Sequence, residues 1–161
     1  MKLPLVITPL VCSAAFALNA ATVHVSEQTG ESFRKADGSK EKPYKDLQAA
    51  LDKVQPGDTI LLAAGNYLGT SNRGYLIMTI PVNLMGGYTT DFANRDVLKN
   101  RTLIQPDASQ NGTARSNASL SLGDPNKPRS FKAEGGIVID GIIFDRGLSN
   151  GYHPTKGKPA D

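Results

Sequence analysis

Acidic and basic side chains around the last apolar run are the residues best suited to chemistry. Asp140 precedes Gly141, and Asp145-Arg146 follows Phe144 directly. A carboxylate beside a guanidinium is a pair that acid–base enzymes use to move protons and to neutralise an anionic substrate. Each also has a structural interpretation, with Asp140 capping a turn and Asp145-Arg146 forming a solvated corner. We expect the structural roles. Asp145 and Arg146 remain candidates for ligand contact, and no residue is identified as catalytic.

The histidines and tyrosines give weaker signals. His24 alternates outward on an expected strand, and His153 has no carboxylate or nucleophile at a recognisable spacing. Tyr67, Tyr75 and Tyr88 could stack on sugar rings if they line one outer face, and packing at corners of the fold is the alternative.

Two glycine-containing segments are expected to turn the chain. Gly86-Gly87-Tyr88 lacks the following helix and the Lys-Ser/Thr of a phosphate loop, so we expect these glycines at a tight corner. Asp140-Gly141 marks a bend between two short strands, because the inward positions shift there from odd to even numbers.

The elements that position these residues begin with a short amphipathic helix. Leu47, Ala50, Leu51 and Val54 recur at helical spacing on one face. Pro56 and Gly57 end the helix. Together with Asp58 they form a turn into an apolar strand over residues 59–63.

Further short strands follow at regular intervals. The pattern predicts them over residues 22–26, 75–80, 82–85, 102–105, 119–122 and 136–144, the last with Ile137, Ile139, Ile142 and Phe144 facing inward. Starts at Thr59, Val82 and Thr102 are roughly one solenoid repeat apart. An antiparallel sandwich is the alternative. The scarcity of Asn-Gly hairpin turns favours the solenoid, since the Asn-Gly at 111–112 lies in a polar loop.

Three segments carry a family resemblance. LQAALDKVQPGDTILLAAGNY, VNLMGGY and GIVIDGIIF resemble the N-terminal part of secreted right-handed parallel β-helix proteins of the pectin lyase-like superfamily, from about Thr22 to Arg146. The resemblance implies an all-β fold, a right-handed parallel β-helix with an N-terminal amphipathic cap helix. Residues 18–150 would be the cap and first coils. The polar tail 151–161 has no closing helix, so we expect it to continue into missing coils.

The resemblance also implies a class of function. It indicates a protein that binds extracellular polysaccharide or degrades it by lyase-type chemistry, with calcium where carboxylates converge. The catalytic coils would then lie beyond this chain. A non-catalytic surface or adhesion stalk is the alternative, because the fold hosts several functions. A third interpretation is a degenerate reading frame that does not fold stably.

The first residues have the layout of a bacterial secretory signal peptide over residues 1–17. Lys2 precedes an apolar run that ends in an A-x-A cleavage site at 15–17, with 18–20 a weaker site. Cleavage removes Cys12, the only cysteine, although a lipoprotein role for it is an alternative. We therefore expect a secreted, periplasmic or cell-surface protein without a membrane span after cleavage.

Composition excludes one class of partner. The chain has 18 basic and 15 acidic residues, a net charge of +3, and the basic residues are spread out. No aromatic residues interleave a basic cluster, so we expect no nucleic-acid partner.

Overall fold

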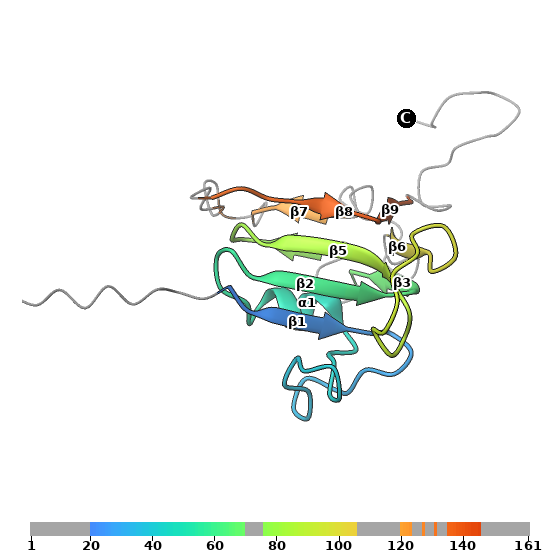
Figure 1. Ribbon diagram of the computed structural model, residues 1–161. Coiled ribbons are helices and arrows are strands. Elements are labelled where there is room, and N and C mark those ends of the chain that lie inside the picture. Colours follow the sequence, from blue (N-terminus) through green and yellow to red (C-terminus); the bar gives the residue numbers. More distant parts are fainter. Residues whose placement is uncertain are drawn as a thin grey trace, which may run out of the picture.

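The computed structural model describes residues 20–69, 76–105, 120–123, 127, 131 and 135–145. They form parallel sheets with almost no helix, which makes the fold all-β (Figure 1). The signal peptide, Cys12, Tyr75, Arg146, His153 and the tail 151–161 lie outside the described residues. The strands are β1 (Thr22–Val25), β2 (Thr59–Ala63), β3 (Gly65–Leu68), β4 (Leu76–Met78), β5 (Asn83–Tyr88), β6 (Thr102–Gln105), β7 (Leu120–Leu122), β8 (Ile139–Asp140) and β9 (Ile143–Phe144).

The strands are arranged in three parallel sheets, ordered β1-β2-β5-β8, β3-β6-β9 and β4-β7. The chain visits the three sheets in the same order twice, through β2, β3 and β4 and then through β5, β6 and β7, before β8 and β9 join the first two. In Figure 1 the first sheet is stacked from β1 at the bottom to β8 at the top. Parallel neighbours need crossover connections rather than hairpins, so the antiparallel sandwich is wrong.

The core is built from side chains that occupy equivalent places on successive strands. Ile60 of β2 pairs with Leu84 of β5, which pairs with Ile139 of β8. Ile104 of β6 likewise pairs with Phe144 of β9. Ile60, Leu84 and Ile104 are fully buried.

The last expected strand is shorter than predicted. Ile139 and Phe144 are in register with buried residues, but they are 39% and 47% exposed. Their exposure follows because β8 and β9 are the last strands of their sheets among the described residues. Ile137 and Ile142 are partly buried against the core.

The helix α1 (Leu47–Leu51) lies behind β1 and β2 in Figure 1. The Asp46 carboxylate caps it by accepting the backbone N–H groups of Gln48 and Ala49. The predicted apolar face is confirmed, since its four residues are buried. The helix ends at Leu51, earlier than predicted, because the Lys53 N–H turns back to the Ala50 carbonyl and tightens the last turn.

The turn before β2 is held by Asp58. Its carboxylate is buried and accepts the backbone N–H groups of Ala21 and Gln55, both at 2.7 Å. Gly57, with φ +91°, takes a conformation that favours glycine.

Gly86 and Gly87 were expected to turn a tight corner between strands. That prediction is wrong, because both glycines lie inside β5. Between Leu61 and Ala63 of β2 the register shifts, because β5 holds one more residue than its partner there. Gly87 has φ +90°, so the glycine permits this bulge.

Candidate functional site

A row of polar side chains crosses the outer face of the sheet β3-β6-β9. Asn66, Gln105 and Asp145 alternate with the inward residues Tyr67, Ile104 and Phe144 along their strands. The Asn66 Nδ2 group donates to Oε1 of Gln105, and Nε2 of Gln105 donates to Oδ2 of Asp145 at 2.7 Å. We call these three residues the polar ladder. It joins segments about 40 residues apart in the chain.

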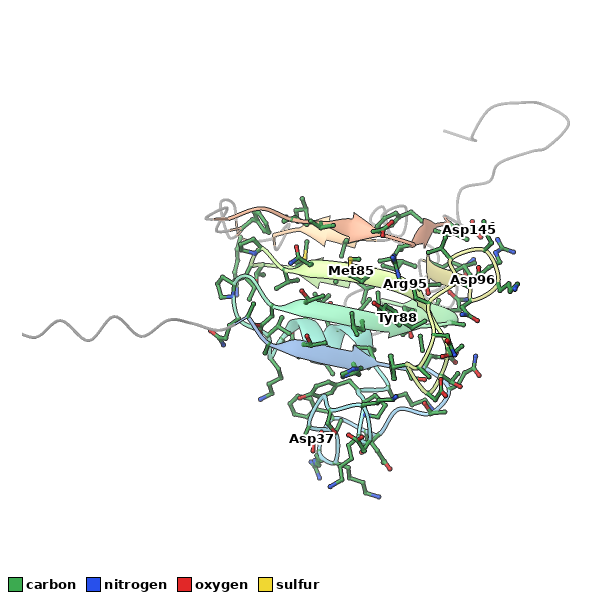
Figure 2. The ribbon with its side chains drawn as sticks, in the orientation of Figure 1. Asp37, Met85, Tyr88, Arg95, Asp96 and Asp145 are labelled. Atoms are coloured by element: carbon green, nitrogen blue, oxygen red, sulfur yellow. The ribbon has the colours of Figure 1, made fainter. Side chains whose placement is uncertain are left out.

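Asp145, one of the two ligand-contact candidates, thus lies at one end of the polar ladder. Figure 2 shows it beside β9. Its backbone N–H donates to the Ile104 carbonyl at 3.0 Å, which continues the pairing of β9 with β6. Sequence reasoning missed Asn66 and Gln105. Gln105 ends the predicted strand over residues 102–105, whereas Asn66 lies on β3, beyond the predicted strand over residues 59–63.

The other end of the polar ladder opens on a cavity of about 350 Å³. Asn66 lines this cavity together with Glu27, Glu31 and Phe33. The Phe33 side chain is 52% exposed, and the Lys53 ammonium lies 4.9 Å from its ring centroid. An exposed aromatic ring beside carboxylates and an amide is a set that binds a polar ligand with an apolar face.

Tyr67 forms part of the cavity wall but is not free to stack on a ligand. It is 2% exposed, and its hydroxyl lies within hydrogen-bond distance of the carbonyls of Val25 (3.0 Å) and Ala63 (2.9 Å). Burial raises the pKa of Tyr67 far above its ordinary value, and the nearby Glu27 carboxylate contributes to the rise. The sugar-stacking role considered for Tyr67 is therefore wrong.

A second cluster lies on the outer face of β1-β2-β5-β8, where Figure 2 shows Met85, Tyr88 and Arg95 on the same side of the sheet. Arg95 Nη2 and Asp140 Oδ2 form an ion pair at 2.6 Å, and Arg95 Nε donates to the Gly86 carbonyl at 2.9 Å. The guanidinium also lies 5.7 Å from the Tyr88 ring centroid. Asp140 therefore pairs with a cation on another segment rather than capping its own turn. Gly141, with φ +68°, makes the bend that follows.

His24 packs into the same face. Its Nδ1 lies 3.1 Å from the Gly38 carbonyl oxygen, and its ring meets Phe92 edge to face with centroids 4.7 Å apart. These contacts give His24 a structural role.

The described residues contain neither a metal-ligand cluster nor a membrane-spanning helix. Within the described part of the chain, no three His, Cys, Asp or Glu side chains gather closely enough to hold a metal ion. No helix in those segments is long and apolar enough to cross a membrane.

Comparison with known proteins yields one family. No curated protein and no solved structure matches the chain. The model of the family described as "Protein of unknown function (DUF1565)" matches residues 28–117, which is more than half of the chain. The matched range includes α1, the strands β2 to β6 and all of the cavity lining except Glu27. The chain belongs to the DUF1565 family.

Proposed function

We propose that this protein binds extracellular polysaccharide through the polar ladder and the adjoining cavity. The observation that carries the proposal is the continuity of the two, since Asn66 belongs to both. Amide and carboxylate groups form directional hydrogen bonds with sugar hydroxyls, and the exposed Phe33 ring offers an apolar surface to a sugar ring. Because the ladder crosses three strands, the bound chain would run across the strands.

For the fold we propose a right-handed parallel β-helix of the pectin lyase-like type, with α1 as its cap. Support comes from the repeated visits to three parallel sheets and from a family associated with parallel β-helix proteins. α1 supports the capping role because it packs its apolar face at the β1 end of the stack. Uncovered strand edges invite association, which a cap prevents.

The proposal includes export, since residues 1–17 have the layout of a signal peptide. The mature protein would be secreted, periplasmic or held at the cell surface, where polysaccharide is available.

Lyase-type degradation is the catalytic form of the proposal, and it rests on the resemblance. Such chemistry needs a base and a cation beside a uronate carboxylate. Arg95 does not supply that cation, because Asp140 and the Gly86 carbonyl hold its guanidinium. Binding is therefore the role proposed for the described residues.

The test is titration calorimetry of the full-length mature protein against neutral, acidic and amino-bearing polysaccharides. Phe33→Ala should weaken binding about fivefold to tenfold through loss of the aromatic contact. Gln105→Ala should also weaken it, because the polar ladder loses its central member. Gln55→Ala, at an exposed site away from the cavity, is the matched control. Absence of binding to every polysaccharide would favour the non-catalytic stalk.

A further inference from the structure

We infer that the cavity selects a saccharide that bears amino groups and discriminates against polyuronates. The inference rests on the proposed binding of polysaccharide and names the chemical class of its ligand. It follows from the direction of the hydrogen bonds in the polar ladder and from the charges around the cavity.

The direction of the ladder is set at Asp145. An ionised carboxylate only accepts hydrogen bonds, so the Gln105 amide must turn its Nε2 group toward Asp145. Its Oε1 atom then faces Asn66, whose Nδ2 group must donate. Asn66 therefore uses one of its two Nδ2 hydrogens within the ladder, and Oδ1 is the acceptor that it adds to the cavity beside the remaining N–H.

The cavity adds further acceptors and negative charge. Glu27 and Glu31 are exposed carboxylates in its lining, and the Asp46 carboxylate there is engaged at the start of α1. Lys45 is the one basic side chain among the described residues that line the cavity. The Lys53 ammonium lies by the Phe33 ring and reduces the negative charge without cancelling it.

A ligand that complements this lining brings hydrogen-bond donors and positive charge. Protonated amino groups supply both. Hydroxyl groups supply donors without positive charge, and uronate carboxylates bring acceptors and a negative charge that the cavity carboxylates repel. The chain as a whole has a net charge of +3, so its overall field favours the polyuronate. A preference for the amino sugar must therefore arise locally.

The test compares three oligosaccharides of equal length with the full-length mature protein, by calorimetry at low salt and about pH 6, where most sugar amines are protonated. The probes are a glucosamine oligomer, its neutral N-acetylated counterpart and an oligogalacturonate. We expect the glucosamine oligomer to bind about fivefold more tightly than the neutral one, as exposed charge pairs allow, and the oligogalacturonate to bind most weakly. The difference should shrink in high salt.

Variants locate the effect. The double substitution Glu27→Gln and Glu31→Gln should abolish the preference for glucosamine while keeping affinity for the neutral oligomer. Glu41→Gln removes an exposed carboxylate outside the cavity lining and should leave the preference intact. Asp145→Asn should weaken all three probes, because the ladder loses its fixed direction.

The outcomes separate the two claims. If none of the three oligomers binds, and the wider panel also fails, the proposed function is overturned. If the oligogalacturonate binds as tightly as the glucosamine oligomer, polysaccharide binding stands and the inference is wrong. The inference is also wrong if the preference survives the double Glu27 and Glu31 substitution.

Discussion

The side-chain amide of Gln48 pairs with the backbone of Ile77 as a neighbouring strand would. Its Oε1 accepts the Ile77 N–H at 2.8 Å, and its Nε2 donates to the Ile77 carbonyl at 3.0 Å. Nε2 also donates to Asp52 at 2.8 Å, which holds the amide in place. A helix side chain thereby satisfies the polar groups of β4 that face α1, at a site where Gln48 is 6% exposed.

Replacing Gln48 should be costly because two partly buried backbone groups of Ile77 lose their partners. Gln48→Leu is expected to lower the free energy of unfolding by about 2–4 kcal/mol in urea titration. Gln48→Glu keeps an acceptor but loses the donor, so an intermediate loss is expected. Gln55→Leu, at an exposed position, should change stability by less than about 0.5 kcal/mol. Equal effects at both sites would show that the pairing with Ile77 does not stabilise the fold.

Gly57 and Gly87 form a matched pair, since their φ angles are +91° and +90°. A Cβ added at Gly57 meets no atom within 4 Å, whereas one at Gly87 lies 2.8 Å from the Val97 Cγ1 atom and 3.0 Å from its Cα. Gly57→Ala should therefore cost only the left-handed conformation, about 1 kcal/mol, and Gly87→Ala about 2 kcal/mol more. Thermal unfolding of both variants measures the difference, and similar losses would contradict close packing at the bulge.

The apolar face of α1 should matter more to stability than the polar ladder. Leu51 is 5% exposed, so Leu51→Asp buries a charge and is expected to cost more than about 4 kcal/mol. Asp145→Ala removes one hydrogen bond from Gln105, with an expected loss of about 1 kcal/mol. If Leu51→Asp does not fold, Leu51→Ala should still lose about 2–5 kcal/mol. If the Leu51 variants lose no more stability than Asp145→Ala, α1 does not cover the core.

The ion pair of Arg95 and Asp140 should contribute little by itself. Its side chains are 29% and 54% exposed, so a double-mutant cycle with alanine should give a coupling of about 0.2–1 kcal/mol that falls with added salt. Arg95→Ala alone should cost more than Asp140→Ala, because the Gly86 carbonyl also loses its donor. A salt-independent coupling would argue against this assignment.

Asp96 makes the stability of the loop after β5 depend on pH. The backbone N–H groups of Lys99 and Leu98 donate to its carboxylate and lower its pKa below the ordinary aspartate value. A depressed pKa in the folded state stabilises the loop above the unfolded pKa, and this contribution is lost as pH falls through the folded pKa. An NMR titration should show Asp96 protonating at lower pH than an aspartate in a short peptide. Asp96→Asn should remove that acid-dependent step, and an unshifted titration would contradict the assignment.

Much of the local structure could be predicted because its causes are local. The predicted bounds of β2 (Thr59–Ala63) and β6 (Thr102–Gln105) are exact, since apolar runs bounded by turns define short strands. The helical spacing of Leu47 to Val54 also identified the buried face of α1. The length of α1 was overestimated, because spacing alone does not show where a backbone turn tightens.

The functional arrangement required long-range information. Asp140 looked like a turn residue beside Gly141, yet its partner is Arg95, which lies 45 residues away in the chain. Gly86 and Gly87 looked like a corner, and only the register against β2 showed a bulge inside β5. The partner of Asp140 and the bulge in β5 both depend on which segments of the chain lie next to each other in the fold.

Short strands and a small amphipathic helix were predictable from the amino-acid sequence, because alternation, helical spacing and turn residues act within a few positions. The ladder of Asn66, Gln105 and Asp145 beside a cavity became visible only in the folded chain. Parallel pairing sets Asn66 opposite Leu103 and Gln105 opposite Leu68, so Asn66 and Gln105 meet diagonally across neighbouring strands. The joined residues lie about 40 positions apart in the chain, and no local pattern specifies this register.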